Sequence, residues 1–225
     1  MTALLEAVDV TKSYGRTPAL RGVSMTIASG EIVAVTGQSG SGKSTLLHCL
    51  AGILRPDAGE VRFEGRVIST ASERERSRLR RTEFGIVFQF GQLVAELPAV
   101  ENVALPLLLS GLSFEKAAEF AMEWLERFEV ADLADDLPGE MSGGQLQRIA
   151  LARALVMSPA ILFADEPTGA LDSLAGEQVM RAVSGFARES GTSVLLVTHS
   201  ATVAAYADRE IRLRDGAVEP VEVLL

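Results

Sequence analysis

Apolar residues fall into short runs near both ends of the chain, and polar turns separate these runs. An apolar run of four to eight residues bounded by turn residues is typical of a strand buried in a sheet. Strands are predicted at Leu4–Val10, Leu20–Ile27, Ile32–Val35, Glu60–Phe63, Arg66–Ile68, Phe84–Phe88, Ile161–Ala164 and Val194–Val197. The polar stretch Thr11–Arg16 predicts the turn between the first two.

The chain changes character between Gly91 and Met157, where apolar residues recur at helical spacing. Helices are predicted at Ala99–Leu109, at Phe114–Phe128 and from Gln145 onward, with a loop at Val130–Gly139, and elsewhere at Leu46–Leu50, Ser72–Arg81 and Leu174–Arg188. We therefore predict one α/β domain whose core comprises residues 1–90 and 158–225, with a mostly helical insertion at residues 91–157.

A glycine-rich stretch, Gly37–Thr45, follows the predicted strand Ile32–Val35 and leads into a predicted helix. Glycines allow a tight turn and let the backbone approach an anion where a Cβ would clash. The helix N-terminus directs free N–H groups at the same anion. Lys43 adds a positive charge for the terminal phosphates, and the Ser44 hydroxyl can ligate Mg²⁺. The stretch therefore predicts a nucleoside triphosphate site formed by Gly37, Ser39, Gly40, Ser41, Gly42, Lys43, Ser44 and Thr45.

Two carboxylates end the apolar strand Ile161–Ala164. Phosphate-loop enzymes place such an Asp near Mg²⁺ at the carboxyl end of a strand, which is the role we expect for Asp165. Glu166 can orient or deprotonate the attacking water. Acidic residues that only cap the next turn are the alternative. The phosphate loop favours the catalytic interpretation.

A second glycine-containing segment, Ser142–Gln145, precedes the helix predicted from Gln145. The Ser-x-x-Gln spacing is that of a capping box, which alone could explain Ser142 and Gln145. It does not explain Gly143 and Gly144, since consecutive glycines are costly at a helix start unless the backbone comes close to something. A bare helix N-terminus beside a serine hydroxyl is a candidate second phosphate site.

Together these motifs resemble those of an ATP-binding cassette ATPase, the nucleotide-binding subunit of an ABC transporter, over essentially the whole chain. Gly37–Thr45 is similar to the Walker A motif, Ser142–Gln145 to the signature, and Asp165 with Glu166 to the end of Walker B. The resemblance implies an α/β fold with a P-loop NTPase core, an N-terminal antiparallel β subdomain and an inserted α-helical subdomain.

The resemblance also implies roles for residues with weaker signals. Gln89 resembles the Q-loop glutamine, which contacts Mg²⁺ together with Ser44 and Asp165. His199 resembles the switch histidine that acts with Glu166 and Lys43 in catalysis. The remaining implied nucleotide contacts are Tyr14, which would stack on adenine, Asp172 of the D-loop, and Ser142, Gly143, Gly144 and Gln145 of the signature.

Each weak signal has a purely structural alternative. Tyr14 could fill a contact at a strand end, Gln89 could be an ordinary polar residue after a strand, and His199 could be hydrogen-bonded only locally. We interpret His48, inside the predicted phosphate-loop helix, as structural. The arginines of Ser72–Arg81 alternate with glutamates, as on a solvated helix face, and carry no nucleic-acid prediction.

The mechanism implied by the resemblance is a composite site, in which the signature helix of a second subunit covers ATP and Mg²⁺ on the Walker A loop. The implied partners are a second cassette, as a homodimer, and an integral membrane permease.

The sequence also resembles one group within the family, that of macrolide export, lipoprotein release and cell division, whose permeases have a large extracytoplasmic domain. The similar stretches are Ala164–Gly169 and Leu171–Ser173. The sequence differs from that usual in the group at Met141, Phe90–Gln92 and Leu97-Pro98. The differences at Phe90–Gln92 and Leu97-Pro98 put the identity of the permease in question.

Charge, motif residues and cysteine content bear on the alternative functions and on the location of the protein. The net charge of −9 argues against an alternative ABC-type ATPase acting on nucleic acid or ribosomes. The presence of Glu166 and His199 argues against a second alternative, an ATP-gated module that does not hydrolyse ATP.

The chain has one cysteine, Cys49, which excludes a disulfide within the chain and favours a reducing cytoplasm. No signal peptide is evident, and the apolar runs are far shorter than the ~20 residues of a spanning helix. We expect a cytoplasmic protein, peripheral on the inner face of the cell membrane through its permease.

Overall fold

The computed structural model describes residues 3–88 and 92–219 and contains two sheets. The larger has the order β10-β9-β3-β8-β7-β6. Its strands are β3 (Ile32–Thr36), β6 (Phe84–Val87), β7 (Ile161–Asp165), β8 (Ser193–Val197), β9 (Arg209–Arg214) and β10 (Ala217–Val218). Adjacent strands from β9 to β6 are parallel, and β10 is antiparallel to β9.

The smaller sheet is antiparallel, with the order β2-β1-β4-β5. Its strands are β1 (Ala3–Tyr14), β2 (Thr17–Ala28), β4 (Ala58–Phe63) and β5 (Arg66–Val67). The helices are α1 (Lys43–Leu50), α2 (Glu73–Thr82), α3 (Ala99–Leu109), α4 (Phe114–Arg127), α5 (Gly143–Leu155), α6 (Ser173–Ser190) and α7 (Ala201–Ala204), with short 3-10 turns at Ala131–Leu133 and Pro138–Glu140. The predicted α/β fold, with its antiparallel β subdomain and helical insertion, is confirmed.

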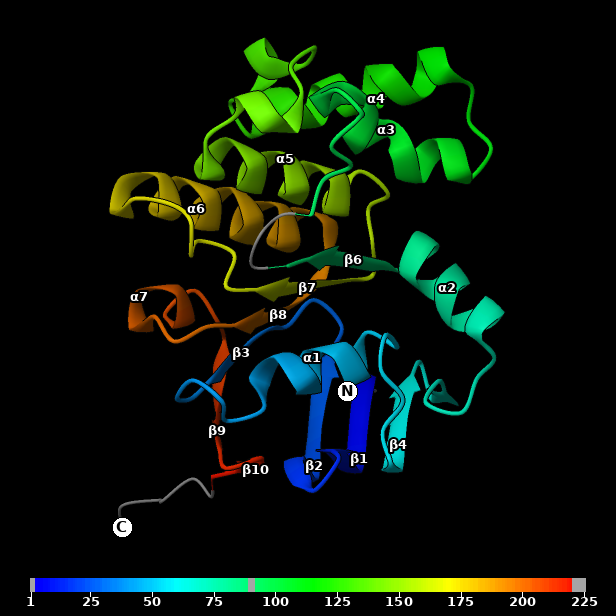
Figure 1. The fold of residues 1–225 in the computed structure, drawn as a ribbon, viewed down its shortest axis with the longest axis vertical. Helices are drawn as coiled ribbons and strands as arrows, with labels where there is room; N and C mark the ends of the chain where they lie inside the picture. Colours follow the sequence, from blue (N-terminus) through cyan, green and yellow to red (C-terminus); the bar gives the residue numbers. More distant parts are fainter. Residues whose placement is uncertain (1–2, 89–91, 220–225) are drawn as a thin grey trace.

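Two hydrophobic cores lie on opposite faces of the larger sheet. Alternate residues of each central strand point to opposite faces. In β3, Ile32 and Ala34 join the core formed with α3 to α6, whereas Val33 and Val35 join the core formed with α1 and the antiparallel sheet. Figure 1 shows α5 and α6 on one side of this sheet and α1 on the other. The strands are uninterruptedly apolar because both of their faces are covered.

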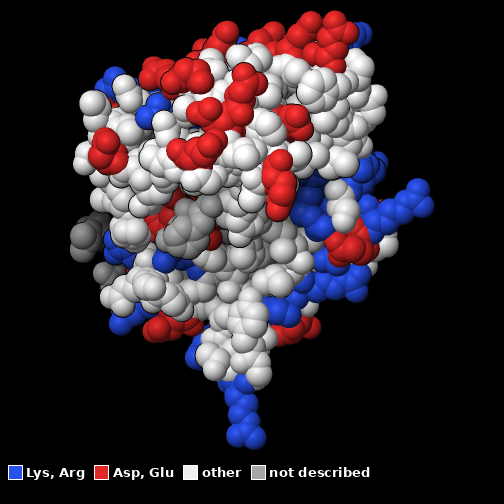
Figure 2. Space-filling view, turned by 45° about the horizontal axis from the view of Figure 1, so that its top comes forward, with Lys and Arg blue, Asp and Glu red and all other residues white. Residues whose placement is uncertain are grey.

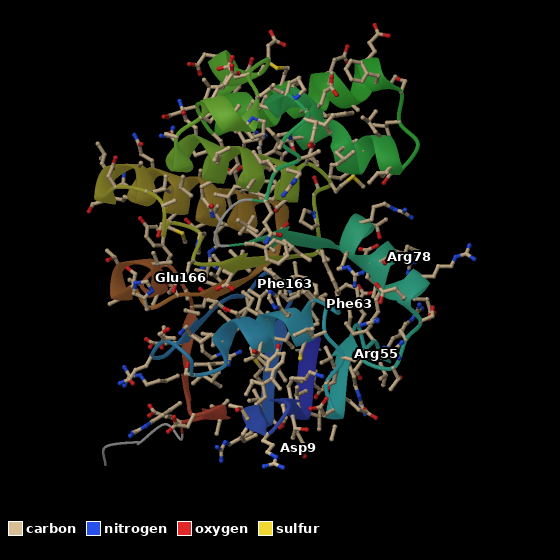
Figure 3. The ribbon with its side chains drawn as sticks, in the orientation of Figure 1. Asp9, Arg55, Phe63, Arg78, Phe163 and Glu166 are labelled. Atoms are coloured by element: carbon tan, nitrogen blue, oxygen red, sulfur yellow. The ribbon has the colours of Figure 1, made fainter. Side chains whose placement is uncertain are left out.

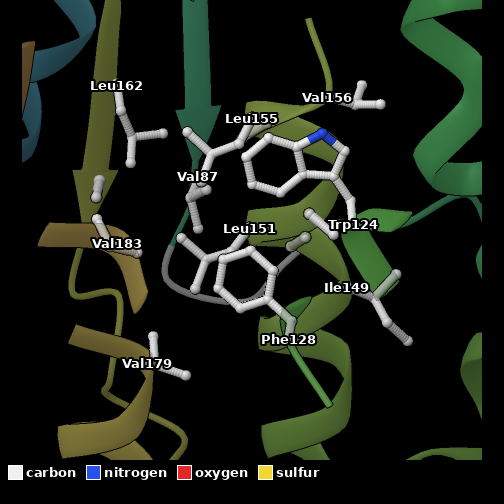
Figure 4. Close-up of a cluster of buried hydrophobic side chains, with 14 of the residues drawn as sticks. Val87, Trp124, Phe128, Ile149, Leu151, Leu155, Val156, Leu162, Val179 and Val183 are labelled. Carbon is white, nitrogen blue, oxygen red and sulfur yellow. The ribbon is translucent and has the colours of Figure 1, made fainter. Parts of the chain in front are cut away.

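Aromatic packing ties the helical insertion to α6. Trp124 of α4 stacks on Phe128 with ring centroids 6.2 Å apart and meets Phe186 of α6 edge-on at 4.8 Å. Figure 4 shows Trp124 and Phe128 beside Leu151 and Leu155 of α5. The insertion is therefore packed against the core through its own apolar side chains.

The polar stretch between the first two strands is wrongly predicted as a six-residue turn. Only Gly15 and Arg16 lie between β1 and β2, because Lys12, Ser13 and Tyr14 continue the pairing with β2. Asp57 stabilises this extension by accepting hydrogen bonds from the Lys12 ammonium and the Ser13 N–H, both at 2.7 Å.

Smaller differences concern helix starts and the C-terminal elements. The helix predicted from Gln145 begins two residues earlier, at Gly143, because Ser142 caps it. The strands β9 and β10 and the helix α7 had no predicted counterpart. In β9, charged residues alternate with Ile211 and Leu213, so no continuous apolar run reveals that this strand pairs with β3.

Acidic charge is concentrated on the helical insertion. Residues 91–142 contain eleven of the chain's thirty Asp and Glu residues but two of its twenty-one Lys and Arg residues. Figure 2 shows acidic side chains gathered at the end of the molecule formed by α3 and α4. The net charge of −9 therefore comes entirely from this region, and the rest of the chain is balanced.

Candidate nucleotide-binding and hydrolysis site

The predicted phosphate-binding and catalytic residues come together because three adjacent parallel strands end at one edge of the larger sheet. The order β3-β8-β7 brings three segments to this edge: the loop after β3, the Thr198-His199 pair after β8, and the Asp165-Glu166 pair at the end of β7. Ligands of open α/β sheets bind at this carboxyl edge. In Figure 3, Glu166 lies on the side of the molecule where α7 also lies.

The glycines of the loop are required by close backbone contacts as well as by conformation. A Cβ on Gly37 would lie 2.1 Å from the carbonyl oxygen of Leu213, and one on Gly42 would lie 2.4 Å from that of Ala19. Gly42 also has a φ of 101°, a conformation that favours glycine. The loop is thus fixed between β9 and β2.

Lys43 crosses the loop that it terminates. Its ammonium donates hydrogen bonds to the carbonyl oxygens of Gly37 at 2.8 Å and Gln38 at 2.9 Å. The first turn of α1 has no acidic residue, and its N-cap, Gly42, has no side chain to occupy the free N–H groups. The Ser41 hydroxyl is buried without a hydrogen-bond partner. This loop offers several unused donors to an anion.

Asp165 and Ser44 form the pair suited to a hard cation. Burial raises the pKa of the Asp165 carboxyl, and the hydrogen bond from Ser44 opposes that shift. A hydroxyl and one carboxylate are the oxygen ligands that Mg²⁺ uses together with substrate phosphates. No group of three or more His, Cys, Asp or Glu residues suited to a metal occurs among residues 3–88 and 92–219. A cation held by these two groups would complete its coordination with oxygen atoms from outside the chain, such as those of water or phosphate.

Glu166 is held by three hydrogen bonds. Its Oε1 lies 2.6 Å from Nδ1 of His199 and accepts the His199 backbone N–H at 3.1 Å, while its Oε2 accepts the Thr198 hydroxyl at 3.1 Å. The backbone of Glu166 has a φ of 49°, which is uncommon for this residue type. Only 13% of the Glu166 side chain is exposed. The carboxylate is therefore fixed in one orientation, at the sheet edge that also carries the phosphate loop.

Thr198, which was not predicted from the sequence, is a further side chain that contacts Glu166. It is completely buried, and its hydroxyl both donates to Glu166 and accepts the N–H of Ser200 at 3.1 Å. Its position directly before His199, at the end of an apolar strand, was the available signal.

The Ser142–Gln145 segment forms the predicted capping box. The Ser142 hydroxyl accepts the Gln145 N–H at 3.3 Å, and Gln145 Oε1 accepts the Ser142 N–H at 2.7 Å. A Cβ on Gly144 would lie 2.9 Å from Cδ2 of Leu171, and one on Gly143 would lie 3.4 Å from Cβ of Ala170. The first would require only a shift of the flexible end of Leu171 and the second is an ordinary van der Waals contact, so packing within the chain does not by itself require these glycines.

Two hollows border the Glu166-His199 pair. One of about 940 Å³ is lined by residues 36–41 of the loop and by His199. The other, of about 560 Å³, is lined by Glu166, Gly169, Asp172 and His199 among others. Ser142–Gln145 lines neither hollow. The largest described hollow, about 1560 Å³, lies between β1-β2 and β9-β10 and contains no residue of the loop.

The remaining predicted residues are placed as follows. Asp172 caps α6 by accepting the Ala175 N–H at 2.9 Å. Tyr14 is 53% exposed at the end of β1, where it pairs with Thr17. Gln89 lies outside the described residues. His48 packs near the Phe88 ring at 5.8 Å, and burial lowers the pKa of its imidazole, in keeping with a structural residue.

Known proteins resemble this chain over almost all of its length. The sequence profile of the ABC transporter family matches residues 20–169. The lipoprotein-releasing system ATP-binding protein LolD of Geobacter metallireducens is 43% identical over 97% of this chain and 99% of its own length. The macrolide export ATP-binding/permease protein MacB of Syntrophobacter fumaroxidans is 42% identical over 96% of this chain, which spans 31% of that longer protein.

A solved structure has the same fold. It is a dimeric ATP-binding cassette in a post-hydrolysis state bound to ADP and Pi, with a TM-score of 0.92 and 39% identity. The match covers 96% of this chain and 97% of the solved chain.

Proposed function

The chain belongs to the ABC transporter family, and we propose that it hydrolyses ATP as half of a dimer that drives a separate membrane permease. Its relatives LolD and MacB are ATP-binding proteins of lipoprotein release and macrolide export. The ADP and Pi in the similar dimeric cassette support ATP as the substrate. No helix among residues 3–88 and 92–219 is long and apolar enough to cross a membrane. The permease would hold this chain at the cytoplasmic face.

The observation that carries the proposal is the fixed orientation of Glu166 at the sheet edge that also carries the phosphate loop. Lys43 and the free N–H groups of α1 would bind the β- and γ-phosphates. Glu166 would accept a proton from the attacking water as general base, with His199 and Thr198 holding its carboxylate. General-base catalysis of this kind contributes about 10²–10⁴ in rate. Tyr14 would stack on the adenine.

Mg²⁺, when bound, would offset the charge on the phosphates. Ser44, Asp165 and Gln89 would hold it. For the first two residues, this assignment is supported by their hard oxygen atoms, which Mg²⁺ uses together with substrate phosphates.

A second copy of the chain completes the site in this proposal. The resemblance of Ser142–Gln145 to the signature and the dimeric state of the similar cassette support a role toward ATP on another copy. Asp172 would face the same interface. Within each copy we propose residues 1–90 and 158–225 as the ATP-binding core and 91–157 as the helical subdomain that contacts the permease. The departures at Phe90–Gln92 and Leu97-Pro98 lie where that contact is expected.

The proposal is tested by ATP hydrolysis and oligomeric state, measured for the wild type and for Glu166→Gln in the presence of ATP and Mg²⁺. The wild type should hydrolyse ATP, and the variant should accumulate as an ATP-bound dimer, because the γ-phosphate stays in place. Lys43→Ala is the control that should neither hydrolyse ATP nor dimerise. If the wild type is inactive and remains monomeric even with membranes containing its permease, the proposal is wrong.

A further inference from the structure

The β1-β2 hairpin touches the phosphate loop at an irregularity of β2. The pairing of β1 with β2 shifts register between Lys12 and Ser13, which leaves Ala19 of β2 without a paired residue in β1. Such a bulge bends a strand and changes the direction of the side chains that follow. The carbonyl oxygen of Ala19 faces the loop, since a Cβ on Gly42 would lie 2.4 Å from it. The end of the hairpin therefore extends from a fixed point beside the loop.

On its other edge, β1 loses its neighbouring strand before it reaches Tyr14. Its pairing with β4 ends at Thr11, opposite Ala58, whereas its pairing with β2 continues to Tyr14. Backbone groups on the uncovered edge must find partners outside a strand. The carboxylate of Asp57, the residue before β4, provides one, because it accepts the Ser13 N–H at 2.7 Å.

Asp57 is itself attached to the same stretch of β1. Its N–H donates to the carbonyl oxygen of Thr11 at 2.8 Å, and its carboxylate also accepts the Lys12 ammonium at 2.7 Å. The Lys12 ammonium, and after it the Ser13 N–H, lower the pKa of this carboxyl, which is therefore ionised at neutral pH. The Asp57 side chain is 48% exposed. A pair this open to solvent adds little to the stability of the whole fold, so its main consequence is the placement of the end of β1.

Tyr14 is the side chain that this arrangement places. It follows Ser13 directly and pairs with Thr17 across the two-residue connection of β1 and β2. Gly15, the first residue of that connection, has a φ of 59°, the positive value that the favoured two-residue hairpin turns need there. Tyr14 is 53% exposed, so its position depends on the backbone that carries it.

We infer that Asp57 is a positioning residue that sets the distance between Tyr14 and the phosphate loop, and thereby the affinity for the adenine base. This inference rests on the proposed function, in which Tyr14 stacks on adenine while the loop binds the phosphates. One nucleotide must reach both groups, so a strand end that swings away from the loop allows stacking for only part of the time. Affinity falls with that fraction, without any contact between Asp57 and the nucleotide.

The test is a double-mutant cycle on the full chain, in which calorimetry measures the binding of ADP with Mg²⁺. ADP has no γ-phosphate to hydrolyse. Tyr14→Ala should weaken ADP binding about tenfold, the scale of one base–aromatic stack. Asp57→Ala should weaken it about fourfold when Tyr14 is present and by less than about 1.5-fold in the Tyr14→Ala background, because coupled residues are not additive. A residue that only stabilises the fold would give the same factor in both backgrounds.

Two further variants provide the comparison. Asp57→Asn keeps an acceptor for the Ser13 N–H and loses the charge, so it should recover part of the affinity. Glu60→Ala is the matched control. The Glu60 side chain is 45% exposed and pairs with Arg62 at 2.6 Å, but both residues belong to β4, so the pair joins nothing to the end of β1. This variant should bind ADP like the wild type, and thermal unfolding verifies that each variant is folded.

Steady-state ATP hydrolysis provides a second readout. Asp57→Ala should raise KM about fourfold and leave kcat within about twofold, since it removes binding and leaves Glu166 and Lys43 in place. Equal factors in both Tyr14 backgrounds, or a lower kcat at unchanged KM, would overturn the inference.

Two other results separate the inference from the proposed function. If Tyr14→Ala binds ADP as tightly as the wild type, the stacking role and the inference are both wrong, whereas ATP hydrolysis by the dimer stands. If the wild type binds neither ADP nor ATP, the proposed function has failed and the inference fails with it.

Discussion

Nδ1 of His199 lies 2.6 Å from Oε1 of Glu166, across a separation of 33 residues in the chain. The imidazole is largely exposed, with 73% of its side chain accessible, whereas the carboxylate is largely buried. The exposed residue thus orients the buried one and remains open to the phosphate side of the site. Two further hydrogen bonds, from the His199 N–H and the Thr198 hydroxyl, hold the carboxylate independently of the imidazole.

His199→Ala is therefore expected to lower kcat by about 10²-fold with little change in KM. Glu166 keeps its two other hydrogen bonds, so the variant should retain more activity than Glu166→Gln. Stability should change by less than about 0.5 kcal/mol, because the lost side chain is exposed. Steady-state kinetics and thermal unfolding measure both quantities. Activity at or below that of Glu166→Gln would contradict a supporting role.

Thr198→Val keeps the volume of the side chain and removes the hydroxyl. Glu166 then loses one donor and the Ser200 N–H loses its acceptor, so we expect a loss of about 1–3 kcal/mol in unfolding free energy. kcat should fall about tenfold, since Oε2 of Glu166 loses its donor and only the two contacts of His199 with Oε1 still hold the carboxylate. Thr198→Ser retains the hydroxyl and should recover most of the activity. A fully active Thr198→Val variant would show that His199 suffices.

Ser142→Ala separates helix capping from nucleotide contact, because α2 has a matching capping box. Ser72 accepts the Glu75 N–H at 3.3 Å, the same distance at which Ser142 accepts that of Gln145. Each alanine variant should cost about 1 kcal/mol of stability. Only Ser142→Ala should also reduce ATP-dependent dimerisation. Equal activity of the two variants would leave Ser142 with capping alone.

Cys49 is expected to resist thiol reagents in the folded protein. Burial raises the pKa of its thiol from the ordinary value of 9.0 to about 11. Near pH 8 the reactive thiolate is then about 100-fold scarcer than for an ordinary thiol. The folded state binds this proton more tightly, so the resulting stability is present below pH 9 and is lost as the pH rises toward 11. Iodoacetamide labelling with and without denaturant, and unfolding between pH 8 and 11, provide the checks.

The sequence by itself determined what depends on neighbouring residues. The uninterrupted apolar strand Ile32–Val35 implied a sheet covered on both faces, and the two cores confirm it. The spacing from Ser142 to Gln145 gave a capping box, which forms as expected. The glycine-rich loop indicated a phosphate site, because its turns and its helix start are encoded within nine residues.

Tertiary structure decided everything that depends on which remote segments meet. Only the order β3-β8-β7 brings His199 and Thr198 to Glu166, and only the packing of α5 brings Arg153 to Gln92. Strand β9 was not predicted because its residues alternate between polar and apolar, and its pairing with β3 is a long-range contact. A pattern of burial specifies how much of each face is covered. Which element covers it depends on the shape and hydrogen-bonding groups of segments far away in the sequence, and these meet only in the folded chain.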